Sequence, residues 1–156
     1  MINISTALLW GFFATLVLST IVRAAREYGI SRMDIPLMVG LMVTPDRDRA
    51  RMYGFLIHLV NGWILSLLYA AFFTSLGLTN WWLGILLGLA HGIFVLVIGM
   101  PLLPGMHPRM ASAANGPDPT RRLEPPGFLA LNYGRRTPII TLLAHGVYGF
   151  ILGVFY

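Results

Sequence analysis

The sequence contains no cysteine and no lysine, and charged residues of any kind are scarce. Without cysteine the chain cannot form a disulfide, a thiolate metal site, a covalent haem attachment or an iron–sulfur cluster. Only 11% of the residues are charged, whereas soluble domains contain about a quarter. The sequence also shows no phosphate-binding glycine loop and no serine nucleophile motif, and these absences disfavour a kinase or a hydrolase.

Four long apolar runs, none with a charged side chain, dominate the remaining sequence. They cover residues 2–22, 53–78, 81–103 and 137–156. A helix needs about 20 apolar residues to cross a bilayer, so each run is long enough. The runs carry no carboxylate, which disfavours an ion-coupled transporter. The sequence therefore predicts one integral membrane domain over 1–156, with an all-α fold and an antiparallel four-helix transmembrane bundle.

All 11 arginines and all 6 acidic residues lie in two connections, between the first and second runs and between the third and fourth. In a four-span chain these two connections share one side of the membrane. The positive-inside rule assigns that side to the cytoplasm, with both termini outside and the long loop between helices three and four cytoplasmic. A net charge of +5 beside long apolar runs indicates a membrane face, not a nucleic-acid partner.

The first connection holds signals for the start of the second helix. Thr44, Pro45 and Asp46 predict an N-cap, a proline at the first helical position and an acid in the first turn. The preceding stretch 33–43 is mostly apolar but too short to cross a bilayer. We expect it to lie along the interface.

Small residues recur at a spacing of about four within each run, and such stripes let membrane helices approach closely. This pattern predicts helix packing at the following positions: Gly11, Gly62, Gly84, Gly88, Gly92, Gly146, Gly149 and Gly153.

Three histidines, His58, His91 and His145, lie inside the runs on the small-residue faces, so they should point at neighbouring helices. Counting the helical rise places His58 and His145 at similar depth, with His91 about one turn deeper. A histidine pair on facing helices can hold haem b or contribute to a metal or quinone site. Alternatively, each histidine is neutral and hydrogen-bonds across helices, which is the reading we favour for the isolated chain.

A second cluster follows the third run and contains Met100, Met106, His107 and Met110. Thioether and imidazole ligands suit Cu(I), so Met106, His107 and Met110 are candidate metal ligands. Irregular spacing and intervening prolines equally fit an interfacial turn with packing methionines.

Segments 100–110, 126–134 and 145–149, together with 38–40 and 58–62, carry a family resemblance. They resemble a family of small four-pass prokaryotic integral membrane proteins with a domain of unknown function. The resemblance implies the fold and a prokaryotic cytoplasmic membrane. It suggests that the histidines and the long loop are important for function, but it does not imply an activity.

From these features we expect a non-catalytic accessory or structural subunit of a larger membrane complex, respiratory or photosynthetic. The small size and the apolar segment 127–134, which can dock on a partner, favour this function. The expected partners are the lipid bilayer and other membrane protein subunits. The alternative is a haem- or metal-binding membrane redox protein that uses the intramembrane histidines.

Overall fold

The computed structural model describes residues 2–112 and 123–156, and all regular elements in these ranges are helical. The long helices are α1 (Ile4–Glu27), α3 (Arg47–Leu76), α4 (Trp81–Phe94) and α6 (Thr137–Phe155). The shorter elements are α2 (Ile35–Gly40), the π-helical η1 (Val95–Gly99), α5 (Met100–Met106) and η2 (Phe128–Tyr133). Segments α4, η1 and α5 follow one another without a loop.

Four helices are long and apolar enough to cross a membrane, namely α1, α3, the continuous Trp81–Met106 and α6. The predictions of an all-α chain and of four such helices are therefore confirmed. The helices run beyond the apolar segments at their arginine-bearing ends, so α1 continues to Glu27 and α3 begins at Arg47. A helix can continue past the hydrocarbon because charged side chains are solvated at the interface.

The start of α3 differs from its prediction. Asp46, not Thr44, is the N-cap: its carboxylate accepts hydrogen bonds from the backbone N–H groups of Asp48 and Arg49. The Thr44 hydroxyl instead accepts a hydrogen bond from the N–H of Asp46, one turn ahead of the helix. Aspartate competes well with threonine as an N-cap, and here it takes the position two residues later.

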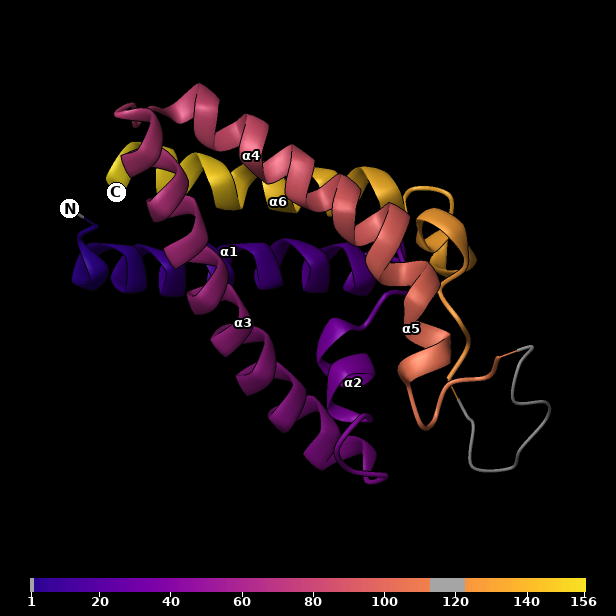
Figure 1. Ribbon diagram of the computed structural model, residues 1–156. Coiled ribbons are helices and arrows are strands. Elements are labelled where there is room, and N and C mark those ends of the chain that lie inside the picture. The colour runs from indigo at the N-terminus through magenta and orange to yellow at the C-terminus, as the bar shows by residue number, and fades with distance from the viewer. Residues whose placement is uncertain (1, 113–122) are drawn as a thin grey trace.

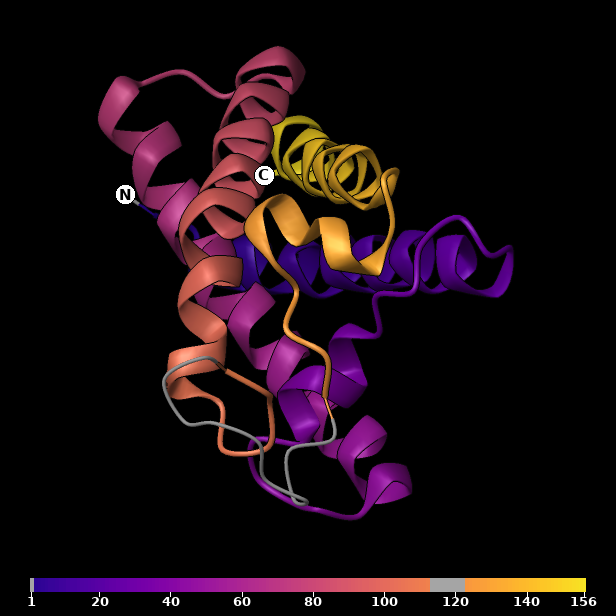
Figure 2. The ribbon, with the colours of Figure 1, turned by 90° about the vertical axis from the view of Figure 1, so that its right-hand side faces the viewer.

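The long helices pack in the order α4, α6, α1, α3. Figures 1 and 2 show α6 between α4 and α1, while α3 crosses α1 and diverges from α4 and α6 toward its N-terminal end. Helix α2 packs on this diverging half of α3. Both chain ends lie at one end of the long helices, and α2, α5 and η2 lie at the other (Figure 1). We call the latter the arginine-rich end, because the described arginines lie in the adjoining turns of α1 and α3 or in the segments that connect the long helices there.

Glycines bring α4 and α6 into backbone contact. A Cβ on Gly84 would overlap the carbonyl oxygen of Gly149, and a Cβ on Gly149 would overlap that of Gly84. One turn along, a Cβ on Gly88 would overlap the carbonyl oxygen of His145. Only glycine allows two helix backbones to approach this closely.

Closely packed small residues also join α3 to its neighbours. A Cβ on Gly62 would overlap the Thr15 hydroxyl of α1, and a Cβ on Gly54 would overlap the Pro36 carbonyl of α2. A Cβ on Gly40 would likewise overlap the Ala50 carbonyl. Close packing at Gly40 and Gly54 fixes α2 against α3 beside the end of α1.

Candidate functional site

The imidazole rings of His91 on α4 and His145 on α6 meet edge to face, with their centroids 4.6 Å apart. His145 donates a hydrogen bond from Nδ1 to the carbonyl oxygen of Thr141, 2.8 Å away. His91 lies with Nδ1 3.3 Å from the hydroxyl of Tyr69 on α3. The structure thus joins His145 to His91, a ring contact that depth counting, which matched His145 with His58, did not predict.

This ring contact limits what the pair can bind. Two axial histidines of one haem lie on opposite faces of the porphyrin, so the macrocycle separates their rings. The edge-to-face contact of His91 and His145 leaves no space for a porphyrin between them. Across residues 2–112 and 123–156, no group of three or more His, Asp or Glu side chains is arranged to hold a metal ion.

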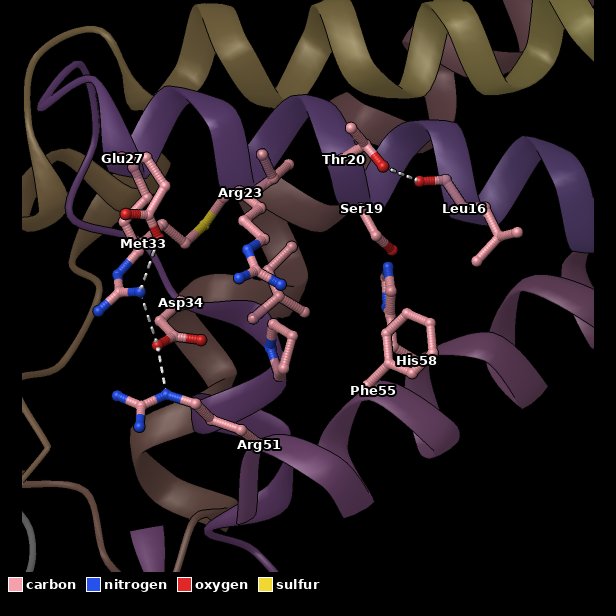
Figure 3. A pocket seen from close by; sticks show the side chains of 14 residues that line it. Leu16, Ser19, Thr20, Arg23, Glu27, Met33, Asp34, Arg51, Phe55 and His58 are labelled. Atoms are coloured by element: carbon pink, nitrogen blue, oxygen red, sulfur yellow. Dashed lines mark hydrogen bonds and ion pairs between the residues drawn. The ribbon is translucent and has the colours of Figure 1, made fainter. Parts of the chain in front are cut away.

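His58 lines a cavity of about 400 Å³ between α1, α2 and α3. Figure 3 shows His58 on α3 and Ser19 on α1 pointing toward each other across the cavity. Both His58 Nε2 and Ser19 Oγ are buried, and neither has a hydrogen-bond partner in the described part of the chain. A buried polar atom without a partner costs free energy, so the inner part of the cavity favours a polar ligand group.

Charged side chains line the other end of the cavity. One oxygen of Asp34 lies 3.4 Å from both the Arg26 and the Arg51 guanidinium groups. The other oxygen caps α2 by accepting the N–H of Leu37. The Asp34 side chain is only 13% exposed, so one carboxylate joins the ends of α1, α2 and α3. Arg23 also lines the cavity, and its guanidinium has no ion-pair partner among the described residues.

The His107 side chain, a candidate metal ligand, is fully engaged in protein contacts. Its Nε2 donates to the Met38 carbonyl oxygen at 2.8 Å, and its Nδ1 accepts the backbone N–H of Arg109 at 3.0 Å. Burial is the main cause that lowers the pKa of His107, and the nearby Arg109 charge lowers it further, while the Met38 contact opposes this shift. Neutral His107 therefore fastens the end of α5 to α2 and has no lone pair free for a metal.

The methionines beside His107 do not share its environment. Met100 and Met110 are buried, whereas the Met106 side chain is 71% exposed. An exposed Met106 and an engaged imidazole do not form a Cu(I) site in this conformation. Met100 and Met110 instead pack in the core, and the expected proline-rich turn is, over Met100–Met106, the helix α5.

A further set of contacts fixes η2 at the arginine-rich end. The Tyr133 hydroxyl donates to the carbonyl oxygen of Glu124 at 2.6 Å, and the Arg32 guanidinium pairs with the Glu124 carboxylate at 3.2 Å. Burial is the main cause that raises the pKa of Tyr133 to about 12. Leu129 and Ala130 have positive φ of 54° and 57°, a left-handed conformation that costs about 1–2 kcal/mol for each non-glycine residue.

No family model, curated protein or solved structure matches this chain. The family resemblance therefore stays a prediction, and the functional argument rests on the geometry.

Sequence reasoning assigned the site residues only in part. It named His58 as a cofactor candidate, it counted Arg23 only among the arginines that indicate the membrane orientation, and it did not name Ser19 as a candidate site residue. The available signal was the spacing of Ser19, Arg23 and Arg26, which places all three along one side of α1. The contribution of Asp34 depends on the placement of α2, which periodicity does not give.

Proposed function

We propose that this chain is a non-catalytic accessory subunit of a larger membrane complex of the respiratory or photosynthetic type. In this proposal the four spans cross a prokaryotic cytoplasmic membrane in antiparallel order. The arginine-rich end and the long loop face the cytoplasm, and both termini face out. The distribution of arginine supports this orientation.

The observation that carries the proposal is a set of large apolar side chains exposed outside the spans. Tyr28 is 82% exposed and Phe128 is 62% exposed, and Val43 and Leu131 are exposed as well. Inside a span such side chains face lipid, but beyond the hydrocarbon they face water unless a partner covers them. Phe128 and Leu131 belong to the same element, η2, and exposed apolar side chains grouped in this way are candidates for an interaction surface.

The surface around Phe128 is also held in one conformation. The Asn132 amide donates to the Pro125 carbonyl at 2.9 Å, and the backbone N–H of Arg32 donates to the Tyr133 carbonyl at 2.7 Å. Together with the Tyr133–Glu124 contact these bonds support the strained left-handed backbone of η2. A preformed surface loses little conformational entropy on binding, which favours a stable subunit contact.

The test is the apparent size of the protein extracted from its native membrane in a mild detergent. We expect the wild-type chain to migrate and co-purify stoichiometrically with integral membrane redox subunits. Phe128→Ala should release it as a free subunit. The matched control is Phe94→Ala, because Phe94 is similarly exposed at 56% but lies in the third span.

Two results would contradict the proposal. One is wild-type protein that migrates alone from its native membrane. The other is a complex that responds equally to Phe128→Ala and Phe94→Ala.

A further inference from the structure

The cavity between α1, α2 and α3 combines apolar walls with polar groups at two depths. Leu16, Val22, Met33 and Phe55 supply much of the apolar surface. Ser19 and His58 lie at the inner level, and the arginines lie at the outer level toward the ends of α1 and α3 (Figure 3). An apolar cavity with a few convergent polar groups is the usual form of a ligand site.

The outer level has an excess of positive charge. Arg23, Arg26 and Arg51 carry three positive charges, and Glu27 and Asp34 carry two negative charges, so the lining residues have a net charge of +1. Arg26 and Arg51 share the Asp34 carboxylate, and Arg23 has no ion pair in the part of the chain described. Guanidinium groups suit phosphate because they donate several hydrogen bonds in a planar array.

The inner level offers hydrogen-bond donors without partners. The Ser19 hydroxyl can donate, and a neutral His58 can donate from Nε2. Both atoms are buried, and neither has a hydrogen-bond partner among the residues that the structure describes. Ser19 precedes Arg23 by four residues on α1, which is about 6 Å along the helix axis. A glycerophospholipid has the same order of groups, because its ester carbonyls lie a few bonds below its phosphate.

We propose that this cavity binds the phosphate and glycerol ester region of an anionic diacyl phospholipid. The phosphate contacts Arg23 and the Arg26–Asp34–Arg51 cluster, and an ester carbonyl accepts hydrogen bonds from Ser19 and His58. The acyl chains follow the apolar walls between α1 and the diverging half of α3. The site is independent of the exposed surface around Phe128, so either proposal can fail without the other.

The test measures lipid binding to the full chain by native mass spectrometry in detergent. The probes are phosphatidylglycerol, phosphatidylcholine with matched acyl chains, glycerol 3-phosphate and inorganic phosphate. We expect phosphatidylglycerol to bind about tenfold more tightly than phosphatidylcholine, as the loss of one charge-assisted contact predicts. The two water-soluble phosphates should bind more weakly, because they lack the acyl chains.

The variants separate the two levels of the site. Arg23→Gln should reduce phosphatidylglycerol binding about tenfold. The control Arg49→Gln removes the same charge from the first turns of α3, outside the cavity, and should have no effect. Ser19→Ala and His58→Leu should weaken the binding of the diacyl lipid and leave the binding of glycerol 3-phosphate unchanged. The melting temperature of each variant, measured by circular dichroism, distinguishes a lost site from a lost fold.

Several outcomes would overturn the proposal. Equal binding of both phospholipids, or equal effects of Arg23→Gln and Arg49→Gln, would mean that the cavity does not select an anionic headgroup. If inorganic phosphate binds tightly and displaces the lipid, the cavity is a simple anion site. A quinone analogue whose binding is weakened by His58→Leu but not by Arg23→Gln would show that the cavity binds a neutral headgroup.

Discussion

Gly84 on α4 and Gly149 on α6 face each other so closely that a methyl group on either would overlap the carbonyl group of the other. The contact is reciprocal, so neither backbone can move aside without opening the interface. In contrast, a Cβ on Gly146, one turn earlier on α6, would meet only a Leu89 methyl group at 3.6 Å. This difference between two glycines of one helix gives a direct test of the packing.

Gly149→Ala should destabilise the protein, by about 1–3 kcal/mol as for other overpacked sites. Gly146→Ala should be neutral or slightly stabilising, since the added methyl group fits and alanine favours a helix. Reversible unfolding in a denaturing detergent, followed by circular dichroism, measures both changes. Equal effects of the two substitutions would show that α4 and α6 do not pack through this surface.

Stability should fall as the pH decreases below about 6.5, the ordinary pKa of histidine, because the folded pKa of His107 lies lower. Between these two pKa values the unfolded chain binds a proton that the folded chain does not, so acid favours unfolding. Protonation would also turn His107 Nδ1 into a donor that faces the donor N–H of Arg109. The protection factor of the Arg109 amide, which is its hydrogen exchange corrected for the intrinsic rate at each pH, should therefore fall between pH 7 and pH 5.

His107→Gln is the matched variant for this effect. Glutamine can still donate a hydrogen bond toward the Met38 carbonyl but does not titrate, so the acid-dependent loss of protection at the Arg109 amide should disappear. If the wild type and the variant lose protection at Arg109 equally in acid, a group other than His107 causes the loss.

The purified protein should show no Soret band from a haem held between His91 and His145, because their rings are in contact. His145→Gln keeps a donor for the Thr141 carbonyl of the same helix and loses the contact with His91, so it should cost at most about 0.6–2 kcal/mol, the range for one interhelical polar contact. Absorption spectroscopy and unfolding in detergent measure the two effects. A Soret band that His145→Gln abolishes would instead support the redox function.

The membrane orientation predicts opposite behaviour of reporters at two positions. A reporter that is active only in the cytoplasm should work when inserted near Asn115, and it should fail when fused after Tyr156. Activity after Tyr156 with none near Asn115 would reverse the proposed orientation.

The sequence alone was sufficient for the helices, because four uncharged runs of 20 residues or more have few alternatives in a membrane. Helix partners were harder to predict. The glycine spacing on α4 identified a packing face, but one-dimensional depth counting cannot tell which helix lies opposite, and so the ring contact of His145 with His91 was not predicted. The cavity was also missed, since it depends on the tilt of α3 and on Asp34, whose two oxygens cap α2 and hold Arg26 and Arg51.

The position of α6 between α4 and α1 has a consequence for biosynthesis. The ribosome completes α4 at Phe94, about forty residues before it begins α6 at Thr137. Until α6 is inserted, the glycine face of α4 has no helix to pack against, and the ring of His91 contacts Tyr69 of α3 but lacks its contact with His145. Maturation should therefore be a late, concerted event, and a truncated chain that lacks α6 should be a preferred substrate of membrane proteases.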